Sequence, residues 1–267
     1  EKVIIGENVT SLGGNSFSNC NKLDDLTILT EKADINNLVL DTTVNLKEIK
    51  VNKDNSKYIV EDAILFSKDG SKIYAYPTGK VGDTYKIPSN VKEIGNSAFQ
   101  GCRSLKNIDI PSTVEKVGTT AFLGSSIITA SINASTTGSY IFLNAPSLEK
   151  VIIGENVTSL GGNSFSNCSK LKSIYIPKSV NYIGNNIFHG CKALENIEVD
   201  KDNTVYDSRN SCNAIIETAR DKMIAASSNT IIMDNVSDIA NGIFAGFSIL
   251  TDTYNKAKQI NPNSFGN

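Results

Sequence analysis

Five cysteines are the residues of this 267-residue chain best suited to chemistry, because a thiol can bind metal, attack a substrate or form a disulfide. Four of them stand three residues after a phenylalanine: Cys20, Cys102, Cys168 and Cys191. Related segments carry Thr43, Ser125, Ala145 or Phe247 at the same place, so the position usually holds a small residue. We therefore expect these four cysteines to be small buried residues with free thiols. The fifth, Cys212, has no obvious mate.

His189 is the single histidine, and no C-x₂-C pair is present, so the usual ligand sets for zinc are missing from the sequence. His189 follows a phenylalanine at a position that elsewhere holds Ser18, Gln100 or Leu123. A position that accepts such different side chains is typical of an exposed turn. Because a histidine base needs a nucleophile or a carboxylate beside it, we expect no histidine-dependent catalysis.

Two short acidic stretches, 54–55 and 200–203, contain oxygen ligands of the kind that Ca²⁺ prefers. Both lack the glycine and the final glutamate of an EF-hand loop, and a lysine stands in or beside each of them. Asx turns, in which the side chain accepts a backbone hydrogen bond, explain these stretches better. The sequence thus predicts no metal, no cofactor and no catalytic centre, and we expect that the protein is not an enzyme.

The charge balance argues against further classes of partner. Lysine plus arginine number 26 and aspartate plus glutamate 28, which gives a formal net charge of −2. Such a balance provides no basic surface for a nucleic acid and no polybasic segment for a membrane surface. No stretch approaches the roughly 18 apolar residues of a spanning helix, so we expect no membrane insertion by this segment.

A repeat organises the chain. Residues 1–20 recur without a change at 149–168, and a weaker pattern of about 23 residues extends around both copies. Its clearest copy is VKEIGNSAFQGCRSLKNIDI at 91–110. A large apolar residue anchors each copy. The anchors are Phe17, Leu40, Phe99, Phe122, Phe142, Phe165, Phe188, Phe244 and Phe265.

The segment L-x-x-I-x-I, which follows most anchors, predicts a short strand. Its last two apolar residues point inward, and the residues eight and ten positions after the anchor point outward. One such unit cannot bury its own apolar edge, so successive units must stack with their strands in parallel. A glycine shortly before the anchor supplies a bend that a side chain would obstruct. The repeat therefore predicts a solenoid.

Two longer intervals, at about 52–86 and 200–232, interrupt the period. Both begin with a similar Asn- and Asp-rich segment that ends in tyrosine, and both continue with two apolar runs around a polar centre. Asp69-Gly70, between the first pair of runs, is a strong signal for a β-hairpin. Each interval is therefore predicted to carry a hairpin within the stack. Since no Pro- or Ser-rich linker separates any part, we expect a single domain over 1–267.

The pattern V-x-x-I-G-x-x-A-F-x-x-C-x-x-L-x-x-I-x-I-P, with its N-x-x-Y and hairpin insertions, resembles BspA-type leucine-rich repeats over nearly the whole chain. The resemblance implies a right-handed leucine-rich-repeat β/α superhelix, with a parallel concave β-sheet and short turns or 3₁₀ segments on the convex side. It also implies a secreted or cell-surface bacterial protein that adheres to a host or bacterial surface protein or glycan. The chain departs from the pattern at Ser131 and Asn133 and again at 253–255.

Binding by such a solenoid is expected at the outward positions of the sheet, which form an extended and rigid surface. Ile152 and Tyr175 should be neighbours there, and an exposed aliphatic residue beside a tyrosine has the composition of an interface anchor. Single exposed apolar residues are, however, also normal on protein surfaces. The predicted ligand-binding residues are Lys150, Ile152, Ser173, Tyr175, Asn196 and Glu198.

The alternative function is a structural spacer or stalk that displays another domain. A spacer needs only interchangeable small polar residues at the outward positions, whereas a binding module needs clustered apolar or aromatic ones. Ile152 and Tyr175 favour the binding module.

The redox state of one pair of cysteines and the extent of the protein stay open. Cys168 and Cys191 stand in adjacent turns, and the spacing of stacked strands is within the range that a disulfide permits. Neither end of the chain resembles the polar cap that solenoids need, so we expect this segment to be part of a longer protein, or an end to be covered by a neighbour.

Overall fold

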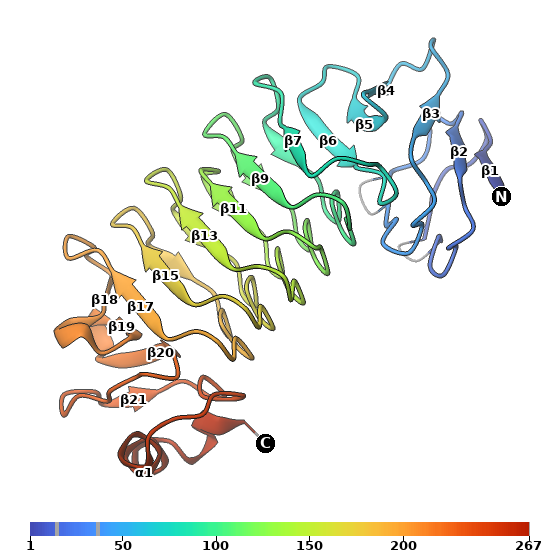
Figure 1. Cartoon of the computed structure of the whole chain (residues 1–267). Helices are drawn as coiled ribbons and strands as arrows, with labels where there is room; N and C mark the ends of the chain where they lie inside the picture. Colours follow the sequence, from blue (N-terminus) through green and yellow to red (C-terminus); the bar gives the residue numbers. More distant parts are fainter. Residues whose placement is uncertain (14–15, 36–37, 267) are drawn as a thin grey trace.

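The chain forms a curved stack of turns in its computed structural model, which describes residues 1–13, 16–35 and 38–266 (Figure 1). The two termini lie at opposite ends of the arc, and each turn adds a strand beside that of the turn before. The predicted fold class, a leucine-rich repeat solenoid of parallel strands with two hairpin insertions, is confirmed.

A first ladder of parallel strands, divided into three sheets, follows the arc from the N-terminal turn to β17. Side chains in these strands alternate between buried and exposed, as in β9, where Ile108 and Ile110 are buried while Asn107 and Asp109 face solvent. This alternation confirms the predicted inward and outward positions. The members are β1 (Lys2–Ile5), β2 (Asp25–Ile28), β3 (Ile49–Val51), β7 (Thr84–Lys86), β9 (Asn107–Ile110), β11 (Thr129–Ile132), β13 (Lys150–Ile153), β15 (Ser173–Ile176) and β17 (Asn196–Val199).

A second ladder, made of strands only two residues long, runs along another side of the stack and was not predicted. The strands from β8 to β16 each end just before the glycine of the repeat, whereas Ala240 follows β21. A Cβ on Gly161 would lie 2.2 Å from the carbonyl oxygen of Gly138, so the glycines allow backbones of successive turns to touch. The members are β8 (Glu93–Ile94), β10 (Lys116–Val117), β12 (Thr136–Thr137), β14 (Ser159–Leu160), β16 (Tyr182–Ile183) and β21 (Asp238–Ile239).

The anchor phenylalanines form a continuous column through the middle of the core. The rings of Phe99, Phe122, Phe142, Phe165 and Phe188 stack in sequence, with centroids 4.9 to 6.1 Å apart. Each of these rings is at most 2% exposed, and Phe17, Leu40 and Phe244 are buried as well, so these predicted anchors are confirmed. The last predicted anchor, Phe265, is only partly buried. Stacking on both faces lets each turn contribute a large apolar surface without leaving a gap to its neighbours.

The cysteines are free thiols, and Cys102, Cys168 and Cys191 are buried, as expected. The expectation is wrong for Cys20, which is partly exposed. The Cys168 thiol donates a hydrogen bond of 3.3 Å to the carbonyl oxygen of Phe142, and that of Cys191 donates one of 2.9 Å to Phe165. Each thiol thus bonds the anchor of the preceding turn. Burial raises the pKa of the Cys191 thiol to about 12, so it stays protonated and unreactive.

The two predicted hairpins are present as small antiparallel sheets. Their last strands, β6 and β20, run parallel to β8 and β21, so the insertions belong to the second ladder. The short 3₁₀ segments η1 (Arg209–Ser211) and η2 (Thr218–Arg220) lie in the second insertion. The strands are β4 (Tyr58–Glu61), β5 (Ile64–Ser67) and β6 (Lys72–Ala75), then β18 (Tyr206–Asp207), β19 (Ala214–Glu217) and β20 (Lys222–Ala226).

Each hairpin forms a wall across the stack, because both of its faces are buried. In β5, Ile64 and Phe66 pack into the central core, whereas Leu65 packs into the N-terminal core. In β19, Ile215 faces the central core and Ile216 the C-terminal one. The apolar interior is therefore divided into three parts by the insertions.

The acidic stretches at the start of the insertions are hydrogen-bonded turns, as predicted. The carboxamide oxygen of Asn203 accepts bonds of 2.9 Å from the backbone N–H groups of Val205 and Tyr206, and its amide donates to carbonyls of the preceding turn. Asn55 makes the same contacts to the backbone of residues 57 and 58. Both side chains are buried, which is consistent with a structural role.

The last turn departs from the repeat where the sequence does. Residues 251–260 form the helix α1 (Thr251–Ile260) in place of a strand of the first ladder, and η3 (Pro262–Phe265) follows. Thr253 and Ala257 are buried, and the Thr253 hydroxyl donates a 2.9 Å bond to the carbonyl of Thr230. The helix packs on the preceding turn through these small residues.

Candidate ligand-binding surface

The outward residues of the first ladder form two rows, which we call the strand face. Neighbouring strands from β7 to β13 are paired in register, and so are β15 and β17. Each row is therefore straight within those sheets. Between β7 and β17, the first row contains Thr84, Asn107, Thr129, Lys150, Ser173 and Asn196. The second row contains Lys86, Asp109, Ser131, Ile152, Tyr175 and Glu198.

All six predicted ligand-binding residues lie on the strand face and are exposed. Ile152 on β13 is 50% exposed and Tyr175 on β15 is 42% exposed. These two strands lie side by side, and the 23-residue interval between Ile152 and Tyr175 places them at equivalent positions of successive turns (Figure 1). The structure therefore brings together an aliphatic and an aromatic side chain within a polar surface.

Two hollows flank Tyr175. One, of about 530 Å³, extends over β7, β9, β11 and β13 and includes Lys150 and Ile152 in its lining. The other, of about 550 Å³, lies beside β17 and includes Asn196 and Glu198. Tyr175, on the strand between them, borders neither hollow and separates the two. The sequence did not predict the hollows: Lys150, Ile152, Asn196 and Glu198 line one or the other, whereas Ser173 and Tyr175 line neither.

The ring of Tyr175 is held by a hydrogen bond that the sequence did not predict. Its hydroxyl donates to the Oδ2 atom of Asp200 at 2.6 Å. This bond raises the pKa of Tyr175 to about 12, and it lowers the pKa of the Asp200 carboxyl. Because the hydroxyl already has a partner, the exposed surface of the ring is presented in a fixed position.

The N-terminal part of the strand face has a different chemistry. Lys2 and Lys50 approach Asp25 at 3.7 and 3.3 Å, and Lys50 also approaches Glu48 at 3.1 Å. Burial acts to raise the pKa of Asp25, but the hydrogen bond from Lys50 and the two lysine charges outweigh it and lower that pKa. These opposite charges pair with one another. We therefore expect this part of the strand face to contribute less to the binding of a partner than the region around Tyr175.

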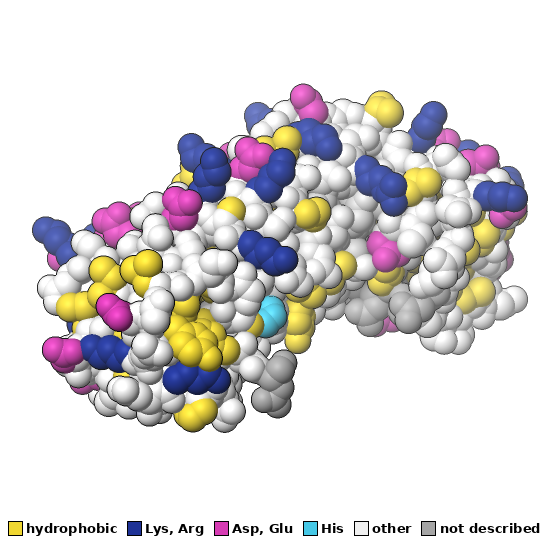
Figure 2. All heavy atoms as spheres, turned by 60° about the horizontal axis from the view of Figure 1, so that its bottom comes forward, with side chains coloured by type: hydrophobic (Ala, Val, Ile, Leu, Met, Phe, Trp, Pro, Cys, Tyr) yellow, Lys and Arg dark blue, Asp and Glu magenta, His cyan; other side chains and the backbone are white. Residues whose placement is uncertain are grey.

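Charge is mixed over the rest of the surface. Figure 2 shows one face of the molecule, on which lysine and arginine alternate with aspartate and glutamate, while hydrophobic side chains gather toward the C-terminal end. Exposed apolar residues in the C-terminal part of the chain include Ile231, Leu250 and Tyr254. His189 is exposed, as predicted for its turn position.

Two classes of feature are missing from the ranges that the structure describes. Within 1–13, 16–35 and 38–266, no three histidine, cysteine, aspartate or glutamate residues are grouped so that they could hold a metal ion. None of the helices in these ranges has the length and apolar character needed to cross a bilayer.

Comparison with known proteins gives a family and a set of related structures. A model of the BspA type leucine rich repeat region matches the chain in six copies, over residues 1–71, 74–195 and 135–267. No curated protein sequence matches the chain.

Several solved structures have a similar fold. A leucine-rich repeat protein from Eubacterium ventriosum is 20% identical, with a TM-score of 0.67 over 94% of this chain and 77% of that one. A leucine rich cell surface protein from Faecalibacterium prausnitzii is 26% identical, with a TM-score of 0.60 over 75% of this chain and 60% of that one. The leucine rich repeat protein of T. pallidum is 19% identical, with a TM-score of 0.56 over 79% and 95% of the two chains. These proteins share the solenoid described above.

Proposed function

Because the chain belongs to the family of BspA type leucine-rich repeat proteins, we propose that it is a secreted or cell-surface recognition module without enzymatic activity. Its partner is a host or bacterial surface protein, which binds at the strand face around Tyr175. The proposed location at the cell surface is supported by the similar F. prausnitzii structure, which is described as that of a cell surface protein.

The observation that carries the proposal is the pair of hollows on either side of Tyr175. Binding energy at protein interfaces concentrates in a few central side chains, among which tyrosine is enriched. Tyr175 is half exposed, fixed by Asp200 and next to the aliphatic Ile152. A protein partner can place one side chain in each hollow and cover Tyr175 between them. Rigid strands reduce the entropy lost on binding.

A spacer is the second candidate, and one observation favours it. Between β7 and β11 the strand face carries mainly small polar or single charged residues, among them Thr84, Asn107, Thr129 and Ser131. Such residues keep a surface soluble without specifying a partner. If the whole face behaved in this way, the protein would hold another domain at a distance rather than bind.

The test begins with the purified chain on an array of extracellular matrix proteins, mucins and glycans, followed by calorimetric titration of a protein that responds. We expect Tyr175→Ala to weaken binding by about 1–3 kcal/mol, roughly 5- to 150-fold in Kd, while the Tm hardly changes. Ile152→Ala should weaken binding less. The double variant should be non-additive, because the two residues stand on adjacent strands.

The chain supplies its own control. Ile4 occupies the same position as Ile152 in the identical segment 1–20 and is similarly exposed, 54% against 50%. Ile4→Ala should leave binding unchanged. If Tyr175→Ala and Ile152→Ala also left it unchanged, the partner would bind elsewhere. A response confined to glycans would contradict a protein partner, and no response at all would favour the spacer.

A further inference from the structure

A cleft of about 680 Å³ lies on the side of the second ladder, away from the residues of the strand face. It is located where that ladder is interrupted: the longest sheet ends at β16, and the next sheet begins at β18. Tyr182 and the turn after β16 line one side, and strands β20 and β21 line the other. Its volume is within the range of small-molecule sites, about 300–1,000 Å³.

Comparison of the two insertions explains why the second one leaves the cleft open. Lys222 pairs with Asp238 on the neighbouring strand as Lys72 pairs with Glu93, so β20 and β6 correspond residue by residue. The counterpart of Ile224 is then Tyr74.

Tyr74 occupies the corresponding position in the first insertion and packs against the N-terminal core. Its ring packs edge-on against Tyr58, with the ring centroids 5.4 Å apart. In the second insertion, Ile224 and Tyr206, the counterparts of those two tyrosines, both line the cleft. The smaller isoleucine therefore leaves open a space at a position that an aromatic ring occupies elsewhere in the same chain.

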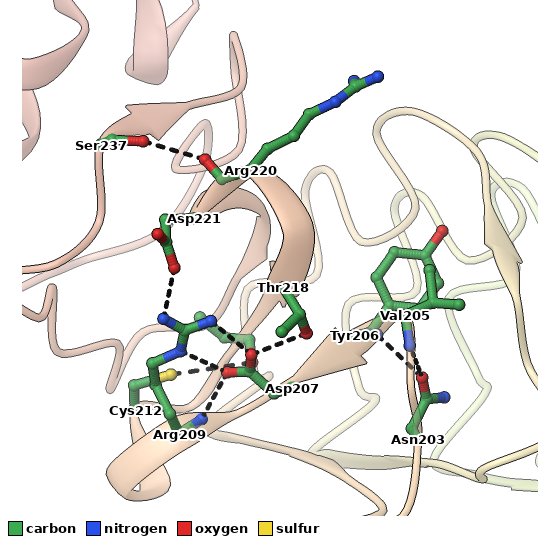
Figure 3. Close-up of polar contacts among 11 residues, drawn as sticks. Asn203, Val205, Tyr206, Asp207, Arg209, Cys212, Thr218, Arg220, Asp221 and Ser237 are labelled. Atoms are coloured by element: carbon green, nitrogen blue, oxygen red, sulfur yellow. Dashed lines mark hydrogen bonds and ion pairs between the residues drawn. The ribbon is translucent and has the colours of Figure 1, made fainter.

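The second insertion, which forms one side of the cleft, is stabilised by a cluster of ion pairs and hydrogen bonds. Arg209 donates to both carboxylate oxygens of Asp207 at 2.6 and 2.7 Å and to Asp221 at 2.6 Å (Figure 3). The Thr218 hydroxyl adds a 2.9 Å bond to Asp207. Arg220 extends away from this cluster and lines the cleft (Figure 3). Bidentate arginine pairs hold geometry well, so the cleft has a preformed wall.

The chemistry of the lining favours an uncharged, hydroxyl-rich ligand. Its cations are already paired: Lys222 Nζ lies 2.6 Å from Asp238, and Arg220 lies 3.7 Å from Glu217. Tyr182, which is 56% exposed, contributes an apolar ring to the lining. A charged ligand would have to break these ion pairs, whereas a neutral one would not.

Three amides supply the polar contacts. The side chains of Asn181, Asn185 and Asn186 line the cleft beside Tyr182 and are exposed. None of the three makes a side-chain hydrogen bond to the part of the chain that the structure describes. Each amide has a carbonyl acceptor and two N–H donors, the combination that pairs with vicinal hydroxyl groups.

We propose that this cleft is a binding site for a neutral oligosaccharide. Tyr182 stacks on the apolar face of one sugar ring, and the amides of Asn181, Asn185 and Asn186 bond its hydroxyls. The site is separate from the strand face, so it does not depend on the function proposed above.

The probes for the test are neutral tetrasaccharides: cellotetraose, xylotetraose, mannotetraose and maltotetraose, each titrated to about 10 mM and followed by saturation-transfer NMR. A sulfated chondroitin tetrasaccharide serves as the charged comparison. We expect at least one neutral sugar to bind the wild-type chain. Ile224→Tyr, which restores the residue of the first insertion, should weaken that binding at least tenfold while leaving the Tm unchanged. Tyr182→Ala should weaken it similarly, and Tyr182→Phe should retain it.

Tyr175→Ala distinguishes this proposal from the previous one, because it should leave sugar binding intact. The proposal would be overturned by no response to any neutral tetrasaccharide, by tighter binding of the sulfated sugar, or by sugar binding that survives both Ile224→Tyr and Tyr182→Ala. Loss of sugar binding in Tyr175→Ala would also overturn it, because the sugar would then lie on the strand face.

Discussion

Residues 1–20 and 149–168 have the same sequence but different surroundings. In the second copy Leu160 and Cys168 are fully buried, whereas the equivalent Leu12 and Cys20 of the first copy are partly exposed. The second copy forms the short strand β14, while the same residues of the first copy make only an isolated bridge between Ser11 and Asp34.

The difference shows that a repeat of this fold is completed by its neighbours. Among the described residues, the second copy has a turn packed on each side, whereas the first copy packs against a turn on one side. The same side chains are therefore core residues in one place and boundary residues in the other. In a stack of this kind, stability is a sum of the contributions of single turns and of the interfaces between them.

The largest difference between the copies should appear at the anchor. The ring of Phe165 stacks between those of Phe142 and Phe188, with centroids 6.1 and 5.9 Å away. Phe165→Ala should therefore lower the free energy of unfolding by about 3–5 kcal/mol. Phe17→Ala should lower it by only about 1–2 kcal/mol, because the first turn can open without the rest. Guanidinium denaturation measures both values. Equal losses would mean that the two turns are equally integrated in the stack.

The glycine of the repeat provides the second comparison. A Cβ on Gly161 would lie 2.2 Å from a backbone oxygen of the preceding turn, whereas one on Gly13 would meet only the Ser16 hydroxyl at 3.5 Å. Neither glycine has a left-handed φ, so the effect of alanine is steric. Gly161→Ala should cost about 1–3 kcal/mol and Gly13→Ala less than about 0.5 kcal/mol. A neutral Gly161→Ala would show that the turns can move apart at no cost.

Most of this architecture could be predicted because it repeats. The anchors, the buried cysteines and the outward rows occupy fixed positions, so each copy supports the others. The second ladder could not be predicted, since a two-residue strand is too short to show an alternation. The sequence does contain a signal for the buried walls: the unbroken apolar run 64–66 lacks the alternation of a one-sided strand.

The two candidate sites also differ in how far the sequence could predict them. Ile152 and Tyr175 could be found from the period, because position within a repeat determines which side chains point outward. The cleft beside Tyr182 could not, since it depends on how one insertion differs from the other. Aligning Lys72 with Lys222 would have revealed the exchange of Tyr74 for Ile224, but not the space that it leaves.

The third comparison concerns the two equivalent thiols. Burial raises the pKa of Cys168 well above its usual value, and its thiol bonds the carbonyl of Phe142, whereas Cys20 is partly exposed. Iodoacetamide at about pH 8 should modify Cys20 and leave Cys168 unmodified until the chain unfolds. Cys168→Ala should cost about 1 kcal/mol, and Cys20→Ala less than about 0.5 kcal/mol. Peptide mass spectrometry identifies the modified thiol. Modification of Cys168 at the rate of Cys20 would mean that the inner turns open readily.

The smallest effect concerns the turns that follow the two copies. After the first copy, Thr27 occupies the outward position that Tyr175 occupies after the second. Tyr175 is distinguished by its bond to Asp200, which favours the neutral phenol and the ionised carboxylate. The Tyr175 hydroxyl should therefore lose its proton near pH 12, and Asp200→Asn should return its pKa toward the ordinary value of about 10.

The bond should also weaken at low pH. The pKa of Asp200 is lowered in the folded chain, so the bond is present at neutral pH and is lost as the pH falls through that lowered pKa. Tyr175 is exposed and Asp200 is partly exposed, so neither change should alter the Tm appreciably. NMR of ¹³C-labelled tyrosine follows the titration, with Thr27→Tyr as the matched control: a tyrosine at the equivalent position, which should titrate near its ordinary value. If Tyr175 and the tyrosine introduced at position 27 titrated together, the Asp200 bond would not set the ring apart, and the case for a fixed binding surface around it would fail.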